Sequence, residues 1–310
     1  MVEPSRRILQ AETVLRMTPV AATLALLAAG GLPAAPIEVP FELEAQMIVV
    51  KGSINGTDSH KLILDTGATA TVIVPPVAKA LGIRSTPAGG SQATGRLETL
   101  SLGGAVVRDL PIFIFDPPQA ISLRLDHGLD YHGLVGYTFL SQFVTTIDYW
   151  KKTLVFTPYD QFHRSPPSAP TADKPIPFHI VNRHIHVTGT LNGKGPATFL
   201  FDTGATETLL TLRTAKQLQL ESQPMTHPPE ARFARLDSLG IGEMKKENLT
   251  VVIYDPPHVK EYGINFDAIL GHSFISQYKV TIDYRRKEMF LTPNPGETPA
   301  TQTPNDDATD

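Results

Sequence analysis

Two short segments of this chain carry residues suited to acid–base chemistry. Asp65–Thr69, which reads Asp-Thr-Gly-Ala-Thr, recurs unchanged as Asp202–Thr206, and each copy follows a short apolar run. A single copy would be ordinary turn chemistry. Two carboxylates about a hydrogen bond apart, however, cannot both ionise and therefore share one proton, so that one accepts a proton from water while the other donates one. The duplication therefore predicts a two-carboxylate site made by Asp65 and Asp202.

The duplication extends far beyond these turns. The segment from Ile48 to Ile73 aligns without a gap on Ile185 to Leu210, and Leu134-Val135-Gly136 returns as Ile269-Leu270-Gly271. A repeat of this length is a half-domain rather than a solenoid unit. We therefore expect two lobes related by a pseudo-twofold axis that brings the two Asp-Thr-Gly turns face to face.

The elements expected to position these turns are short strands. Asn55-Gly56 and Asn192-Gly193 are strong hairpin signals with apolar, β-branched segments on either side. Helical pattern is limited to 76–81, 212–220 and one turn after each apolar-apolar-Gly segment. The predicted fold class is mostly β.

Composition excludes several classes of function. The 310 residues are 41% hydrophobic, which is enough for two packed lobes. The net charge of −4 belongs to the acidic C-terminal tail, so the body is near neutral and lacks the clustered Lys and Arg of a nucleic-acid binder. With no cysteine, disulfides, thiolate metal sites and Cys nucleophiles are excluded.

The ends and the middle of the chain differ from the repeated halves. Arg6, Arg7 and Arg16 precede an apolar stretch from Val20 to Leu32, the layout of a signal peptide or of an uncleaved anchor, although a disordered or mis-started N-terminus stays an alternative. We therefore expect export to the periplasm, secretion, or anchoring on the outer side of the inner membrane. The predicted organisation is a signal peptide or N-terminal anchor over 1–35, an N-terminal lobe over 36–158, a Pro-rich linker over 159–177, a C-terminal lobe over 178–293 and a disordered acidic tail over 294–310.

From Ile48 to Pro293 the chain resembles the retropepsin-like aspartic proteases, in particular the bacterial single-chain type with two lobes. In that family each half supplies one Asp-Thr-Gly turn, supported by a downstream apolar-apolar-Gly segment. The resemblance implies two acid-protease β-barrel lobes with an active-site cleft between them. It implies that Asp65 and Asp202 are catalytic, and that the supporting residues are Thr66, Gly67, Thr203, Gly204, Gly136 and Gly271.

The function implied is aspartic endopeptidase activity on a peptide or protein substrate, by a monomer that needs no cofactor and no metal. The alternative is a non-catalytic peptide-binding or inhibitor protein on the same scaffold, for which a second carboxylate would be unnecessary. A glycoside hydrolase that uses the same two carboxylates is a further alternative, but it would need carboxyl groups at least ~5 Å apart, which twofold-related Asp-Thr-Gly turns would not give. Ala68 and Ala205 stand where pepsin-like enzymes carry a hydroxyl, which implies activity nearer neutral pH.

Two features depart from the retroviral pattern. Tyr137 and His272 stand where retroviral enzymes usually carry Arg. The helical turn after each apolar-apolar-Gly segment, which we call the support helix, must therefore be held differently. The Gly-rich segment 85–97 is the candidate for a substrate-covering flap. Its counterpart, 221–235, contains Pro and no Gly, so we expect one working flap, in the first half.

The remaining polar candidates are weaker. His184 and His186 lie on one face of a predicted strand and could bind a metal, but no third ligand is visible, and a solvated strand face is the preferred interpretation. His132, with Asp267 at the matching place, is interpreted as a polar turn residue. A turn or edge role is also expected for Asp148 and Asp283.

Overall fold

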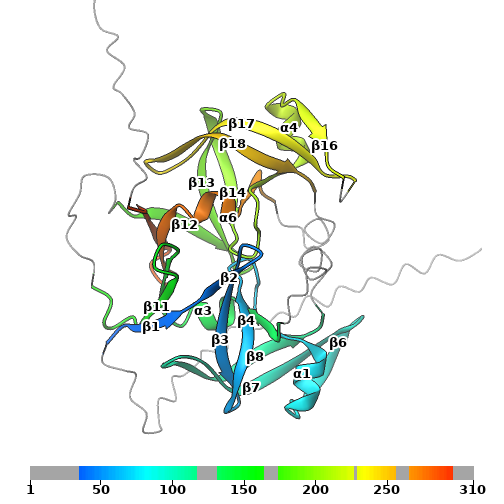
Figure 1. Ribbon diagram of the computed structural model, residues 1–310, viewed down its shortest axis with the longest axis vertical. Helices are drawn as coiled ribbons and strands as arrows, with labels where there is room; N and C mark the ends of the chain where they lie inside the picture. The colour runs from blue at the N-terminus through cyan, green and yellow to red at the C-terminus, as the bar shows by residue number, and fades with distance from the viewer. Residues whose placement is uncertain (1–34, 117–130, 164–173, 227–228, 256–264, 296–310) are drawn as a thin grey trace, which may run out of the picture. The chain divides into compact units, whose positions relative to one another are not determined.

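The computed structural model describes residues 35–116, 131–163, 174–226, 229–255 and 265–295 (Figure 1). The expected signal segment and acidic tail, and most of the Pro-rich linker, therefore lie outside the described residues. None of the helices in the described ranges is both long enough and apolar enough to cross a membrane.

Most of the described chain is β-structure, so the predicted fold class is confirmed. The elements of the first half are β1 (Ile37–Pro40), β2 (Glu42–Glu44), β3 (Met47–Ile54), β4 (Thr57–Leu64), β5 (Thr71–Ile73), α1 (Pro75–Ala80), β6 (Ser85–Gly89), β7 (Gln92–Leu102), β8 (Ala105–Ile114), β9 (Gly133–Val135), α3 (Tyr137–Leu140), β10 (Val144–Asp148) and β11 (Thr153–Thr157). Those of the second half are β12 (Ile176–Val181), β13 (His184–Leu191), β14 (Lys194–Phe201), β15 (Leu209–Leu210), α4 (Leu212–Gln217), β16 (Ser222–Pro224), β17 (Arg232–Ile241), β18 (Met244–Ile253), β19 (Ala268–Leu270), α6 (His272–Ile275), β20 (Tyr278–Asp283) and β21 (Glu288–Pro293).

Each half closes a ring of strands, which we call the first and the second lobe. In the first lobe the order is β3-β4-β9-β5-β8-β7, and β7 pairs back onto β3 (Figure 1). In the second lobe β13-β14-β19-β15-β18-β17 closes in the same way through β17 and β13. Both rings enclose Leu, Ile, Val and Phe side chains, and the core that they form continues from one lobe into the other. The sequence repeat is therefore a structural repeat.

Local turn chemistry fixes the register of these strands. Asn55 and Gly56 have φ of 51° and 79°, and Asn192 and Gly193 have φ of 50° and 70°, as a two-residue hairpin turn with both residues left-handed requires. The side chain of each Asn also accepts a hydrogen bond from the backbone of the strand alongside, at 3.1 Å from Thr99 N and 3.0 Å from Ser238 N. The turns thereby bind each hairpin to its barrel.

A further sheet joins the lobes. Its strand order is β1-β11-β10-β20-β21-β12, and the antiparallel pairing of β10 with β20 crosses from one lobe to the other. At its centre the hydroxyls of Thr146 and Thr281, equivalent residues of the repeat, lie 2.9 Å apart. Asp148 and Asp283 have the predicted turn roles, because each accepts backbone N–H bonds from the residues that follow it.

Aromatic residues are exchanged between the lobes near this sheet. Tyr149 of the first half packs edge-on against His272 at the start of α6, with ring centroids 5.4 Å apart. Tyr284 of the second half packs in the same way against Tyr137 at the start of α3, at 5.6 Å. These contacts show how the support helices are held without the Arg of retroviral enzymes, because the first residue of each support helix packs against a tyrosine from the opposite lobe.

Both halves form the hairpin that was expected to work as a flap only in the first. β6 and β7 pair across Gly89 and Gly90, and both glycines have positive φ. β16 also pairs with β17, from Ser222 to Pro224, although this segment has no Gly. β16 ends at Pro224 and β17 begins at Arg232, so the connection is longer than the one between β6 and β7, and part of it, 227–228, lies outside the described residues.

Candidate active site

The two aspartates lie at the ends of buried central strands. β4 ends at Leu64 and β14 at Phe201, and each pairs in parallel with the strand of its own apolar-apolar-Gly segment. The backbone N–H of Asp65 donates to Val135 O at 3.0 Å, and that of Asp202 donates to Leu270 O at 3.1 Å. The backbone of each aspartate is thus fixed at the point where the strand ends and the turn begins.

The threonines of the two turns hold the lobes together by reciprocal hydrogen bonds. Thr66 N donates to Thr203 Oγ1 and Thr203 N donates to Thr66 Oγ1, both at 3.0 Å. Each hydroxyl then donates across the lobe boundary, to Phe201 O at 3.1 Å and to Leu64 O at 3.0 Å. Both side chains are buried. The predicted turn-holding role of these threonines thus takes the form of an interlobe lock.

The glycines of the turns are set by close approach. A Cβ on Gly67 would stand 2.5 Å from Asp202 Cγ, and one on Gly204 would stand 2.7 Å from Asp65 Cγ, both shorter than real Cβ contacts. Each turn therefore packs its glycine against the carboxyl group of the other turn. The two carboxyl groups are hydrogen-bonded to each other, so the structure brings Asp65 and Asp202 together as a pair.

The apolar-apolar-Gly segments lie directly behind the turns. A Cβ on Gly136 would be 2.7 Å from Ala68 O, and one on Gly271 would be 2.9 Å from Ala205 O. The residues that follow donate to the same carbonyl oxygens, Tyr137 N to Ala68 O at 2.9 Å and His272 N to Ala205 O at 2.7 Å. All eight residues named from the sequence thus fall in one cluster, four from each lobe.

A second layer of hydroxyls was missed in the sequence. Thr71 N donates to Thr138 Oγ1 at 2.9 Å, and the equivalent Thr208 N donates to Ser273 Oγ at 2.8 Å. These bonds tie the strand after each aspartate to its support helix. The signal was present in the repeat, because a hydroxyl residue stands at the second helical position in both halves, but hydroxyls are common in turns and indicate no partner.

The environment of the pair favours the protonated form. Burial raises the pKa of both carboxyl groups. For Asp65, which is 5% exposed, the charge of Asp202 and the hydrogen bond to it raise the pKa further, well above its usual value, against the backbone N–H groups of Gly67 and Ala68 that donate to Oδ1. Asp202 is half-buried. The pair therefore retains one proton at a pH where two isolated carboxyl groups would be ionised.

A buried tyrosine lies within the field of this pair. Burial, and then the charge of Asp202, raise the pKa of the Tyr149 hydroxyl above its ordinary value. Its Oη has no hydrogen-bond partner in the part of the chain that the structure describes. Tyr149 thus remains a neutral group close to Asp202.

The two histidines of β13 are buried. His184 and His186 are 7% and 6% exposed, so the predicted solvated strand face is wrong: β13 lies between β12 and β14, and both rings are covered. The described residues contain no group of three or more His, Cys, Asp or Glu that could hold a metal. His132 and Asp267 do have one shared backbone role, since they accept from Lys61 N at 3.2 Å and Thr198 N at 2.8 Å.

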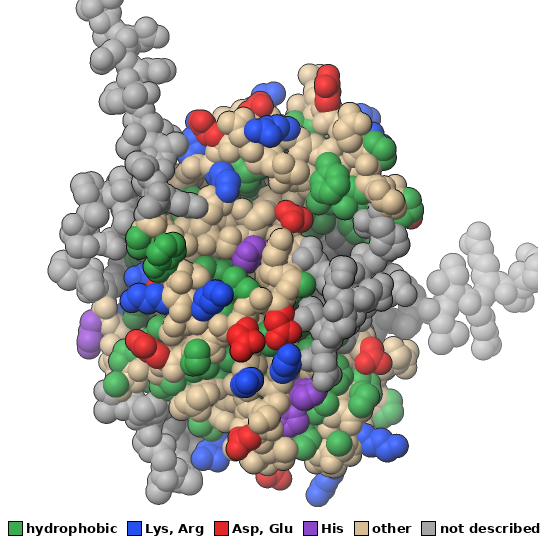
Figure 2. Space-filling model, viewed as in Figure 1, with side chains coloured by type: hydrophobic (Ala, Val, Ile, Leu, Met, Phe, Trp, Pro, Cys, Tyr) green, Lys and Arg blue, Asp and Glu red, His purple; other side chains and the backbone are tan. Residues whose placement is uncertain are grey.

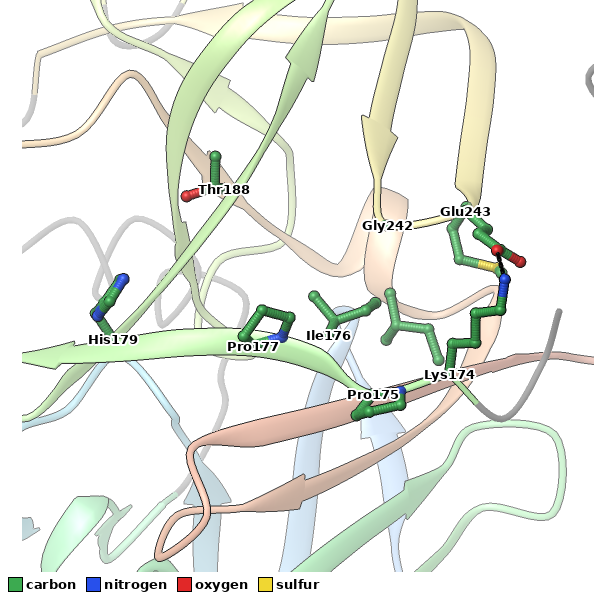
Figure 3. A pocket seen from close by; sticks show the side chains of 10 residues that line it. Lys174, Pro175, Ile176, Pro177, His179, Thr188, Gly242 and Glu243 are labelled. Carbon is green, nitrogen blue, oxygen red and sulfur yellow. Dashed lines mark hydrogen bonds and ion pairs between the residues drawn. The ribbon is translucent and has the colours of Figure 1, made fainter. Parts of the chain in front are cut away.

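Two other surface features do not belong to the pair. The pocket in Figure 3 lies between β12 and the β17–β18 turn, where Lys174 and Glu243 form an ion pair beside Pro175 and Ile176, and none of its lining residues comes from the Asp-Thr-Gly turns. On the face of the molecule drawn in Figure 2, acidic and basic side chains are interspersed.

Comparison with known proteins finds a matching family model and matching solved structures. The model of the family described as aspartyl protease matches residues 50–139 and 187–274. An aspartic proteinase from Irpex lacteus is 14% identical, over 84% of this chain and 98% of that one, with a TM-score of 0.50, and so has a similar fold. A retropepsin-like aspartic protease from Rickettsia conorii is 19% identical, over 39% of this chain and 88% of that one, with a TM-score of 0.30. No curated protein matches the chain.

Proposed function

Because the chain belongs to the aspartyl protease family, we propose that it is an endopeptidase in which Asp65 and Asp202 together activate a water molecule. The observation that carries this proposal is the hydrogen-bonded carboxyl pair, with each turn's glycine packed against the opposite carboxyl group. Family and fold support a proteolytic role. The assignment of that role to these two residues rests on the geometry of the pair.

The reaction that fits this geometry needs only one proton on the pair. The ionised carboxyl group takes a proton from water, and the water oxygen bonds to the carbonyl carbon of the peptide while the other carboxyl group gives its proton to the carbonyl oxygen. As the C–N bond of the tetrahedral intermediate breaks, the carboxyl group that took the proton from water gives it to nitrogen, and the carboxylate left on the other side takes back a proton from a hydroxyl of the intermediate. The pair ends with one proton, as it began.

The geometry also bears on the rival functions. A retaining glycosidase needs its two carboxyl groups about 5 Å apart to admit the sugar carbon, whereas these two are hydrogen-bonded to each other. A peptide-binding protein or inhibitor on the same scaffold would bind extended peptides without cutting them. The two raised carboxyl pKa values are costly for such a protein, because burying ionisable groups destabilises the fold.

The test is a digest of an unbiased peptide library by the purified chain, with products identified by mass spectrometry. Asp65→Asn and Asp202→Asn, each shown to be folded by circular dichroism, are the matched variants. We expect cleavage by the wild type, loss of at least about 10³-fold in kcat/KM in either variant, and one ¹⁸O atom from labelled water in each new carboxyl group. Wild-type turnover by either folded variant would refute the assignment, and binding without any cleavage would favour the inhibitor alternative.

A further inference from the structure

The two halves of the site differ at one position that faces the carboxyl pair. In the β13–β14 hairpin His186 pairs with Leu200, and the same register carried two residues past this last paired position would set His184 opposite Asp202. In the β3–β4 hairpin Val49 pairs with Ile63, and the same extension would set Met47 opposite Asp65. Directly opposed residues of an antiparallel pair have Cβ atoms about 5 Å apart on one face of the sheet. In agreement with this alignment, the charges of His184 and Asp202 act on each other, whereas the aligned residue of the first half, Met47, carries no charge.

The contacts of His184 connect it to both turns. Its ring reaches the carbonyl oxygen of Gly67, in the turn of the opposite lobe, and that of Val181 on β12. The ring is 7% exposed, and its Nδ1 has no hydrogen-bond partner among the described residues. His184 is therefore held beside the pair rather than in solvent.

We propose that His184 is a positioning residue that makes the two aspartates unequal, favouring the carboxylate on Asp202 and leaving the shared proton on Asp65. On this basis Asp202 is the group that accepts the proton of water, and Asp65 is the group that donates to the substrate carbonyl. The catalytic consequence of this proposal rests on the proposed function, whereas the electrostatic difference between the two aspartates is independent of it.

The electrostatics of the surroundings support this direction. The charge of His184 lowers the pKa of Asp202, and the charge of Asp202 raises that of His184 against burial, which is the largest influence and lowers it. The ring of His186 on the same strand also interacts with the imidazole, and Asp65 is coupled to Asp202 within the pair. Arg183 precedes it in the β12–β13 turn and His179 on β12 pairs with His186; both are exposed. The neutral Tyr149 lies in the field of Asp202.

One effect opposes the proposal. Asp65 Oδ1 accepts two backbone N–H bonds, from Gly67 and Ala68. Within the described chain Asp202 Oδ1 accepts such a bond from Gly204, and the backbone of Gly67 lowers the pKa of Asp202 only as its smallest influence. Hydrogen bonds to a carboxylate favour its ionised form, so the bonds at Asp65 alone would place the charge there. The deeper burial of Asp65 and the imidazole opposite Asp202 act the other way, and we expect their sum to prevail.

The first test uses the pH profile of kcat/KM, with His184→Gln and the matched variant His186→Gln. An imidazolium opposite Asp202 eases the first ionisation of the pair, so the neutral Gln at 184 is expected to move the acid limb to higher pH, with activity below it falling about tenfold per pH unit. His186→Gln makes the same chemical change two residues further from Asp202 and should keep the wild-type limb. An unchanged acid limb in folded His184→Gln, or an equal shift in both variants, would overturn the proposal.

The second test needs no turnover and therefore separates this proposal from the proposed function. The imidazole resonances of His184 and His186 are titrated by NMR in the wild type and in Asp202→Asn. Because coupling between two sites is reciprocal, removal of the Asp202 charge is expected to lower the pKa of His184 and to leave that of His186 in place. A His184 titration that is identical in the two proteins would refute the coupling. A shifted titration in a chain that cleaves no peptide would support the coupling and count against the proposed function alone.

Discussion

Replacement of Thr66 by Val removes a hydroxyl that makes two buried bonds across the lobe boundary. Valine has nearly the same shape, so packing is retained, but Thr203 N loses its acceptor and Phe201 O loses a donor. A buried polar group left without a partner costs about 1–3 kcal/mol, so the two together are expected to lower the free energy of unfolding by about 2–5 kcal/mol. For a chain of this size that corresponds to a fall in Tm of roughly 5–15 °C.

The matched control is Thr66→Ser, which keeps the hydroxyl and deletes only a buried methyl group, at a cost of about 1 kcal/mol. Urea denaturation and thermal melting of wild type, Thr66→Val and Thr66→Ser give the comparison, and Thr203→Val with Thr203→Ser repeats it in the other lobe. Activity should fall further in the Val variants, because the lock also sets the distance between the carboxyl groups. A Thr66→Val protein as stable as Thr66→Ser would show that the interlobe bonds contribute nothing net, and would refute this reasoning.

Three further predictions follow from the electrostatics of the pair and from the N-terminal sequence. Ala68→Ser adds a hydroxyl that can bond the ionised form, so it should lower the pKa of the pair and move the alkaline limb of kcat/KM to lower pH; a limb that stays in place would exclude this account. Because the pKa of Asp65 is raised in the folded state, the wild type loses stability as pH rises from the pKa of the unfolded state through that of the folded state. Asp65→Asn should therefore be more stable than the wild type at neutral pH and lose that advantage in acid. Urea denaturation at neutral and at acid pH measures the difference. The segment before about residue 32 should be removed, or should anchor the chain, in the native host, and an intact soluble cytosolic form starting at Met1, found by fractionation and N-terminal mass spectrometry, would contradict this.

The repeat in the sequence predicted those parts of the fold that depend on local signals. Asn55-Gly56 and Asn192-Gly193 specify their hairpins through the left-handed turn alone, and the apolar runs before Asp65 and Asp202 specify buried central strands. The cluster of turn and support residues followed because equivalent segments must be equivalent in space. These predictions needed no knowledge of a partner.

Contacts between distant segments could not be predicted in this way. Alternation along a strand indicates which side chains share a face, but not which strands lie on either side. The sequence therefore predicts a solvated face for His184 and His186, whereas β12 and β14 enclose them. The contacts of Tyr149 and Tyr284 with the opposite lobe could not be predicted either, because a tyrosine that recurs in both halves indicates a similar environment but does not identify the residue it packs against. Which residues pack against one another is decided only when the barrels close and the sheet that joins them forms.

The single chain makes the proposed asymmetry possible. In a symmetric homodimer any substitution appears on both sides of the twofold axis, so a histidine opposite one aspartate would also stand opposite the other and would favour neither. Here the duplicated halves have kept the groups that must match, the threonine lock and the paired glycines, and differ at positions 47 and 184, where a difference costs no interlobe hydrogen bond between the turns.

Exchange of these two residues, Met47→His with His184→Met, should therefore reverse the preference and place the carboxylate on Asp65. The imidazole introduced at position 47 would then stand opposite Asp65 in the β3–β4 register, as the native one stands opposite Asp202. NMR titration of that imidazole in the exchanged protein, repeated after adding Asp65→Asn, measures the coupling directly, because removal of the facing charge should lower the pKa of the ring. A titration at position 47 that is insensitive to Asp65 would show that register alone does not decide which aspartate holds the proton.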